Sequence, residues 1–324
     1  MPTDLQTADP PHTPATVIPA RAARFVTAAR SSNTRRAYAS AWEAFCAFCA
    51  TTGSAPRPAG AALVADYLTH LAESGRKVAT INMATAAIAA AHRTAGLDDP
   101  TKQEAVRLLL TGIRRELGTA PAQKAPAMRT DLARMLASLP DSLAGRRDRA
   151  LLLLGFAGAF RRSELVALDV ADLRFNAGGL VIVLRRSKTD QEGQGALKHV
   201  PQLSEAALCP VRALQAWLDS AGIVSGPVFR KVDRWGVVGA RRLAPGAVAE
   251  LIKRAATAAG MEPRQFAGHS LRAGFATQAA ADDVDTLAIR EVTGHKSDAM
   301  LARYVRSGGA QARTAVRRAL GERG

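Results

Sequence analysis

The chain has 324 residues, of which 44 are Lys or Arg and 28 are Asp or Glu, so the formal net charge is +16. This length allows two domains with separate cores. The excess of positive charge indicates a polyanionic partner, so we expect a nucleic-acid-binding protein. The longest apolar run, residues 150–158, is too short to cross a bilayer, which excludes a membrane-spanning class.

The N-terminus has no basic region followed by an apolar one, so we expect no signal peptide and a cytoplasmic, nucleoid-associated protein. The three cysteines, Cys46, Cys49 and Cys209, cannot build a disulfide framework. Cys46 and Cys49 have CxxC spacing, but no second pair or nearby histidine completes a zinc site. We therefore expect these cysteines to pack in a core, and we expect no metal.

The first third of the chain indicates a helical domain after a disordered tail. Residues 1–20 contain five prolines and no Lys or Arg, a composition that cannot bury enough apolar surface to fold. Residues 21–117 then carry apolar side chains at 3–4 spacing, and Asn33 or Thr34 is the expected first N-cap. The predicted helices are residues 33–51, 59–73, 78–95 and 102–117.

Residues 118–127 are rich in Gly, Ala and Pro and predict an extended, exposed linker. Residues 128–324 combine the 3–4 spacing of helices with the alternation of strands. The predicted fold class is therefore mainly α with a small β-sheet: an all-α N-terminal domain and an α+β second domain. The strands are predicted at residues 180–184, 196–203 and 227–230. The helices are predicted at residues 129–138, 146–157, 161–168, 210–221, 245–259, 270–281, 285–293, 297–305 and 310–320.

Polar residues suited to phosphate chemistry recur along the second domain. Arg161 is followed three residues later by Glu164 on the same helical face, a pair that alone predicts only a surface ion pair. His269 and Arg272 are also three residues apart, at a helix start that suits a phosphate. His295 precedes Tyr304 by nine residues. Tyr304 is the only tyrosine of the second domain, which makes it the candidate nucleophile.

A lysine completes the set, and two positions compete for its role. Lys188 ends a predicted strand in Arg185-Arg-Ser-Lys188-Thr, where a hairpin tip can reach into a groove. Lys198 lies on the return strand and is the alternative. We favour Lys188. Two arginines, a lysine, two histidines and a tyrosine are what breaking and rejoining a phosphodiester through a tyrosine needs.

This ordered set resembles the tyrosine recombinase (phage integrase) family, in particular its Cre-like and Xer-like members. The resemblance covers nearly the whole chain past residue 30. The matching segments are Ser32–Tyr38, Arg161–Leu165, Arg186–Thr189, Gly268–Arg272 and Thr293–Tyr304. One departure is Ala273-Gly274, where many Xer-type members carry a second histidine and Cre-like members do not.

The resemblance implies a core-binding domain with a SAM-like helical fold at residues 21–117 and a catalytic domain at residues 128–324. It implies a site-specific recombinase that cleaves and rejoins DNA through a 3′-phosphotyrosine intermediate and a Holliday junction, without metal or ATP. Arg161 and Arg272 would clamp the phosphate, and Tyr304 would attack it. His269 would act as base, Lys188 as general acid, His295 as hydrogen-bond donor to the phosphate, and Glu164 as support.

The expected partners are double-stranded DNA with paired inverted-repeat sites and three further copies of the chain in a synaptic tetramer. The free protein would be a monomer or dimer. The helix at residues 310–320 would dock on a neighbouring protomer, or alternatively pack in cis. The candidate DNA contacts of the first domain, each of which could equally be a solvated charge, are Arg35, Arg36, Arg76, Lys77, Arg93, Arg114 and Arg115.

Three alternatives are weighed against this reading. A non-catalytic DNA-binding protein on the same scaffold would not need the complete residue set. A type IB topoisomerase-like enzyme would share the chemistry without synapsis. Metal-dependent strand transfer would need a carboxylate cluster, for which Asp282, Asp283 and Asp285 are available. Asp is an ordinary residue between two helices, where it caps the second one, so we expect no metal site there.

Overall fold

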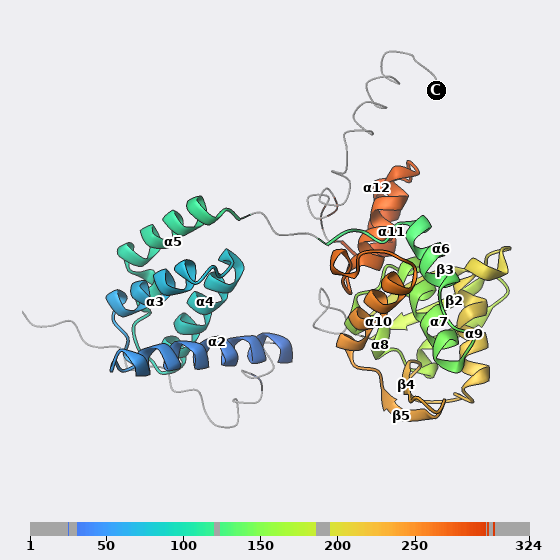
Figure 1. Ribbon diagram of the computed structural model, residues 1–324, viewed down its shortest axis with the longest axis horizontal. Coiled ribbons are helices and arrows are strands. Elements are labelled where there is room, and N and C mark those ends of the chain that lie inside the picture. Colours follow the sequence, from blue (N-terminus) through green and yellow to red (C-terminus); the bar gives the residue numbers. More distant parts are fainter. Residues whose placement is uncertain are drawn as a thin grey trace, which may run out of the picture. The chain divides into compact units, whose positions relative to one another are not determined.

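The computed structural model describes residue 25 and residues 31–119, 124–185, 195–295, 297 and 301. The chain divides into two compact units, Met1–Ala122 and Gln123–Gly324 (Figure 1). The predicted tail and the predicted helix at 310–320 lie outside the described residues, as does most of the helix predicted at 297–305.

The described part of the first unit contains helices and no strand. Each helix contributes a fully buried side chain to one core, namely Phe45, Leu68, Ile88 and Val106. The 3–4 spacing of apolar residues explains this, because it places them on one face of each helix. The helices are α2 (Ser32–Thr51), α3 (Ala61–Glu73), α4 (Val78–Thr94) and α5 (Glu104–Leu117).

The cap of α2 differs from the prediction. Ser31 is the N-cap, and its Oγ accepts a hydrogen bond from the backbone N–H of Thr34 at 3.2 Å. Asn33 and Thr34, the predicted caps, lie inside the first turn of the helix. All four residues from Ser31 to Thr34 are of types that cap or border helix starts, so the sequence pattern could not select among them.

The second unit is built around α7 (Leu143–Ala157), in which Leu151, Leu152 and Leu154 are fully buried. A helix that is apolar on every side lies inside the core, which explains the longest apolar run of the sequence. No helix within the described ranges is long and apolar enough to span a membrane. The other helices are α6 (Arg129–Ala137), α8 (Arg162–Ala167), α9 (Pro210–Ser220), α10 (Pro245–Ala258), α11 (Ser270–Ala281) and α12 (Thr286–Thr293).

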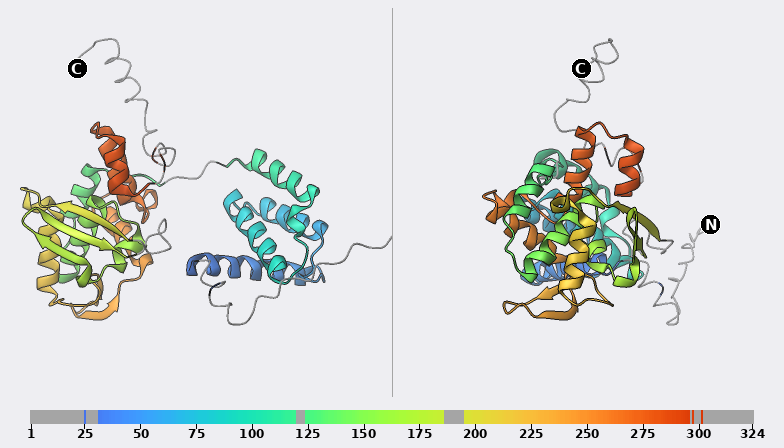
Figure 2. Two further views of the ribbon diagram at one scale, coloured as in Figure 1. Left: turned by 180° about the vertical axis from the view of Figure 1, so that it is seen from behind. Right: turned by 90° about the vertical axis from the view of Figure 1, so that its right-hand side faces the viewer.

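Two small antiparallel sheets complete the second unit. One contains β1 (Leu173–Asn176), β2 (Gly179–Leu184) and β3 (Ala196–Pro201) in that order. The other is a hairpin of β4 (Arg230–Val232) and β5 (Val238–Arg242). Figures 1 and 2 show this hairpin and α12 at opposite ends of the unit. The predicted fold class, mainly α with a small sheet, is confirmed.

Strands β1 and β5 were not predicted, and the third strand begins at Arg230 rather than Pro227. β1 is mostly exposed, and β5 consists largely of Gly, Ala and Arg. Such sequences have weak strand preference, so these strands form through pairing with a neighbour rather than from a local pattern.

The segment before α6 is docked on the second unit, unlike the exposed linker predicted up to residue 127. The backbone N–H groups of Ala125 and Ala127 donate to the carbonyls of Gln265 and Ser270 at 2.8 and 2.9 Å. Ala127 is fully buried. A Cβ at Gly274 on α11 would lie 1.8 Å from the Ala127 carbonyl oxygen, so glycine permits this close approach.

We expect Gly274→Ala to destabilise the protein by about 1–3 kcal/mol, because the added methyl group meets backbone that cannot rotate away. Urea unfolding followed by circular dichroism measures the change. Gly246→Ala on α10 is the matched control, since its Cβ would meet nothing within 4 Å. Equal stability of the two variants would contradict the docked position of Ala127.

Candidate active site

Arg161 is held by a buried carboxylate at the start of α8. Glu164 in the first helical turn is 4% exposed, and its Oε1 accepts from Arg161 Nη1 at 2.6 Å. Its Oε2 accepts from the backbone N–H of Arg161 at 2.9 Å. The first bond fixes the guanidinium and the second fixes the backbone of the same residue. The guanidinium has five N–H donors and so retains capacity to bind an anion.

Arg272 on α11 is bound to the turn that precedes Arg161. It is 2% exposed, and its Nη1 donates to the Ala159 carbonyl at 2.8 Å. Ala159 is fully buried and has a φ of 46°, a conformation that is unfavourable for a residue with a Cβ. The strained turn therefore follows α7, and its Ala159 carbonyl accepts the hydrogen bond from Arg272. Arg161 follows two residues later in the chain.

His269 lies one turn before Arg272, at the N-cap of α11. Unlike Arg272 it is exposed. A residue at this position lies beside the unpaired N–H groups of the helix start, where an anion is favoured. The two residues thus lie at the same end of α11, with Arg272 buried and His269 facing solvent.

Lys198 on β3 lies at the same site. Its Nζ is 5.2 Å from the centre of the Phe160 ring and donates to the carbonyl of Val292. The pKa of Lys198 is lowered to about 8, chiefly by burial; the charge of Glu164 opposes this shift, and the charges of Arg272 and Arg161 add to it. Lys198 is therefore close enough to these groups to feel their charges.

His295 follows α12 at a sharp turn formed by Gly294, which is left-handed with φ 64° and ψ 38°. His295 is 7% exposed, and its Nδ1 lies 2.8 Å from the Thr293 hydroxyl. Burial, with the largest effect, and the charges of Arg272, Arg161 and Lys198 together lower the pKa of His295 to about 4. His295 is therefore neutral at pH 7 in the protein without DNA.

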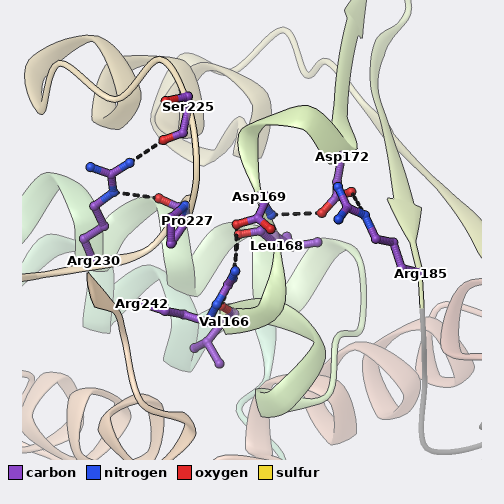
Figure 3. A network of polar contacts seen from close by, with 9 residues as sticks. All are labelled: Val166, Leu168, Asp169, Asp172, Arg185, Ser225, Pro227, Arg230 and Arg242. Carbon is purple, nitrogen blue, oxygen red and sulfur yellow. Dashed lines mark hydrogen bonds and ion pairs between the residues drawn. The ribbon is translucent and has the colours of Figure 1, made fainter. Parts of the chain in front are cut away.

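A polar network in the second unit holds the far end of α8 (Figure 3). Arg242 on β5 donates through Nη1 to the carbonyls of Val166 and Leu168 at 2.7 and 3.0 Å. Its Nη2 lies 2.7 Å from Asp169 Oδ1. The guanidinium thus satisfies carbonyls that the short helix leaves unpaired at its C-terminus.

The same network fixes the end of β2. Asp172 is 4% exposed, and its Oδ2 accepts from the backbone N–H of Asp169 at 2.9 Å. Its Oδ1 accepts from Arg185 Nε at 2.7 Å, as Figure 3 shows. Arg185 is three residues before Lys188, so the ion pair anchors the base of the predicted hairpin. Lys188 and Tyr304 themselves lie outside the described residues.

Basic side chains also surround a cleft of about 440 Å³ beside His269. Its lining includes Lys124, Arg162, Lys253 and Arg264. Positive charge next to a helix start attracts the phosphates of a nucleic-acid backbone. In the first unit, the seven predicted DNA contacts are all exposed: Arg35, Arg36, Arg76, Lys77, Arg93, Arg114 and Arg115.

The carboxylates that metal-dependent strand transfer would need make helix-cap and ion-pair contacts instead. Asp285 caps α12, and its Oδ1 accepts from the N–H groups of Leu287 and Ala288. Asp282 pairs with Arg129 at 3.7 Å. Within the described ranges, no group of three or more His, Cys, Asp or Glu residues could hold a metal ion.

Sequence reasoning ranked Lys198 second and did not select Thr293. A signal for Lys198 existed, because alternation along β3 puts it on the same face as the buried Val200. A lysine on the inward face of a strand is unusual unless it serves a site. Thr293 carried no such signal, because its contact with His295 depends on how the chain turns at Gly294.

The buried Arg272 and the largely covered Arg161, with a lysine and a neutral histidine beside them, are an arrangement suited to phosphoryl transfer. The phage integrase family model matches residues 127–310, which is more than half of the chain. The integrase/recombinase xerD homolog of Selenomonas ruminantium is 40% identical over 293 residues, covering 89% of this chain and 85% of that protein. Recombinase cre of Escherichia phage P1 is 26% identical over 301 residues, covering 86% and 84%.

Solved structures share the fold. A lambda integrase dimer bound to a COC′ core site aligns with a TM-score of 0.59 at 17% identity, covering 90% of this chain and 94% of that one. The Tn1549 transposon integrase in complex with transposon right-end DNA aligns with a TM-score of 0.58 at 18% identity, covering 83% and 88%. The chain therefore belongs to the phage integrase family. It is a tyrosine recombinase, an enzyme of DNA strand exchange, as the sequence motifs predicted.

We expect Glu164→Gln to slow DNA cleavage by at least tenfold, because the amide cannot hold the Arg161 guanidinium as the carboxylate does. The loss of a buried charge-assisted bond should also lower the free energy of unfolding by about 1.5–3 kcal/mol. Single-turnover cleavage and urea unfolding measure the two effects.

Glu250→Gln is the matched control, because Glu250 forms an i, i+3 pair with Lys253 at the surface, with 65% of its side chain exposed. That variant should behave like the wild type. An unaffected cleavage rate in Glu164→Gln would contradict a supporting role for this carboxylate.

Proposed function

We propose that this recombinase acts at paired inverted-repeat DNA sites in a synaptic homotetramer, through a 3′-phosphotyrosine on Tyr304 and a Holliday junction. The observation that supports it most is the joint position of Arg161 and Arg272, which the Ala159 turn links. Both lie close enough to Lys198 and His295 to lower their pKa values.

The two arginines would grip the non-bridging oxygens of the scissile phosphate and stabilise the charge of the in-line transition state. Their positions are set before DNA binds, by Glu164 for the first and the Ala159 carbonyl for the second. Preorganised donors stabilise a transition state without having to move during the reaction.

Tyr304 would attack phosphorus, forming the Oη–P bond as the bond from phosphorus to the 5′-oxygen breaks. At pH 7 only about one part in a thousand of an ordinary tyrosine is phenolate, since its pKa is about 10. A base is therefore required, and His269, exposed beside the start of α11, is the candidate. Lys188 would protonate the leaving 5′-oxygen.

DNA would be bound by both units. The exposed arginines and Lys77 of the first unit and the basic cleft beside His269 would neutralise backbone phosphates. The free protein would be a monomer or dimer and would act on nucleoid DNA in the cytoplasm. Residues 310–320 would dock on a neighbouring protomer in the tetramer.

We expect wild-type protein in EDTA to form an SDS-resistant, protease-sensitive adduct with DNA from around its own gene. Tyr304→Phe should bind the same DNA and form no adduct, because it lacks the attacking oxygen. Denaturing gel electrophoresis of labelled DNA measures both. An adduct that persists in Tyr304→Phe would show that another residue is the nucleophile.

The general acid can be identified with a DNA whose scissile 5′-oxygen is replaced by sulfur. A thiolate leaves without being protonated, so this substrate should restore cleavage to a variant that lacks the acid. We expect Lys188→Ala to be slow on ordinary DNA and restored on the sulfur substrate. Lys198→Ala should be less impaired and should gain no more from sulfur than the wild type does. Restoration of Lys198→Ala instead would move the role to the lysine on β3.

A further inference from the structure

Arg162 follows Arg161 in the chain, and its side chain lies on the loop that leads to His269. A Cβ at Gly268 would lie 1.7 Å from Cδ of Arg162 and 2.6 Å from its Cγ. Only glycine leaves room for the arginine stem at such a distance, because a Cβ does not approach another heavy atom so closely. Gly268 is buried, although the next residue, His269, is exposed. The stem of Arg162 therefore packs on the backbone at Gly268.

Arg162 also lines the cleft of about 440 Å³ that contains His269. It is partly exposed, and among the described residues its guanidinium has no hydrogen-bond or ion-pair partner. Arg161 and Arg272 differ in this respect, because each donates to an oxygen atom of the protein. All five N–H donors of Arg162 thus remain available to a ligand in the cleft.

The charge of the cleft selects an anion. Its charged lining residues are Lys124, Arg162, Lys253 and Arg264, and none of its described lining residues is Asp or Glu. Lys124 Nζ donates to the Arg264 carbonyl at 2.7 Å, which joins two of the basic residues across the lining. Lys253 pairs with Glu250 at 3.1 Å, outside the cleft. Positive charge in a concave surface concentrates the potential there and attracts a phosphate.

We infer that Arg162 binds the DNA phosphate next to the scissile one, and that Gly268 provides the space that its side chain needs. The proposed function assigns the cleft as a whole to backbone phosphates; this inference rests on it and assigns one residue to one phosphate. Consecutive Cα atoms are about 3.8 Å apart, and one DNA strand advances about 3.4 Å along the helix axis per nucleotide. Two consecutive arginines can therefore serve two successive phosphates.

The neighbours of the two arginines fit this division of roles. Arg161 is held by Glu164 on its own helix, whereas Arg162 lies on Gly268 in the loop before α11. The planar fork of a guanidinium can donate two parallel hydrogen bonds to one phosphate, which a lysine cannot do. A phosphate held at Arg162 would fix the DNA strand beside His269, the candidate base, and so help to position the scissile phosphate.

The contact can be counted from the salt dependence of DNA binding. Fluorescence anisotropy of labelled duplex DNA from around the gene measures the affinity of the full-length protein between about 50 and 200 mM salt. We expect Arg162→Ala to bind about tenfold more weakly and to reduce the log–log salt slope by about 0.9, because one phosphate contact is lost. Arg162→Lys keeps the charge and should keep the slope. Arg212→Ala, which removes an exposed arginine of α9, is the matched control and should match the wild type. An unchanged slope in Arg162→Ala would overturn the inference.

A double-mutant cycle tests the part played by Gly268. Gly268→Ala should displace the arginine stem and reproduce the loss of affinity of Arg162→Ala. The three atoms nearest to a Cβ at Gly268 all belong to Arg162, so the added methyl group has room once that side chain is gone. Adding Gly268→Ala to Arg162→Ala should therefore change the affinity by less than about twofold. An equal loss in both backgrounds would show that the glycine acts through something other than Arg162 and would overturn the pairing.

The particular phosphate has a separate readout. On DNA that the wild type cleaves, a neutral methylphosphonate replaces the phosphate on one side of the scissile phosphate, and then the one on the other side. At the position that Arg162 binds, this change should weaken wild-type binding about tenfold and Arg162→Ala by less than about twofold. Equal losses for the two proteins at both positions would overturn the assignment. Absence of cleavage by the wild type would count against the proposed function, while the salt slope, which needs no cleavage, would still decide whether Arg162 binds a phosphate.

Discussion

The site depends on holding two guanidinium groups close together, one buried and one largely covered, before any phosphate is present. Like charges repel, and removal from water makes this unfavourable unless each group has a partner. Glu164 supplies a carboxylate for Arg161, and the Ala159 carbonyl supplies an acceptor for Arg272. The remaining positive potential acts on the neighbours, lowering the pKa values of Lys198 and His295. The charge of the two arginines thus acts on the lysine and the histidine beside them.

The rest of the second unit keeps this arrangement rigid. The buried helix α7 ends in the strained Ala159 turn, and α8 is fixed at its far end by Arg242. On the other side, α11 is held by the segment through Ala127, whose carbonyl approaches so closely that only glycine fits at position 274. These contacts join segments that are far apart in the sequence. A large part of the second unit is therefore needed to hold the few side chains of the site in place.

Much of this was predictable, because ordered motifs identify chemistry even when their contacts are unknown. The fold class followed from the periodicity of the helices and strands, and the family and enzyme class followed from the resemblance of an ordered set of residues to known recombinases. Glu164 was predicted as support for a neighbouring basic group, and in the structure it bonds Arg161.

Other features could not be read from local patterns. The strands β1 and β5 form only by pairing, Ala127 is buried because α11 lies against it, and Thr293 reaches His295 through a turn at Gly294. Lys198 is an intermediate case. The alternation along its strand predicts that it faces inward, but it does not predict which residues lie beside it. Tertiary contacts therefore account for most of what the sequence did not predict.

The most direct test of the arginine pair uses DNA in which a neutral methylphosphonate replaces the scissile phosphate. If Arg161 and Arg272 act by neutralising the phosphate, removing its charge should restore much of the cleavage lost in Arg161→Ala and Arg272→Ala. Wild-type protein should gain little from the same change. Variants that remain as inactive on the neutral substrate as on ordinary DNA would contradict the account, because the arginines would then serve a purpose other than balancing the charge of the phosphate.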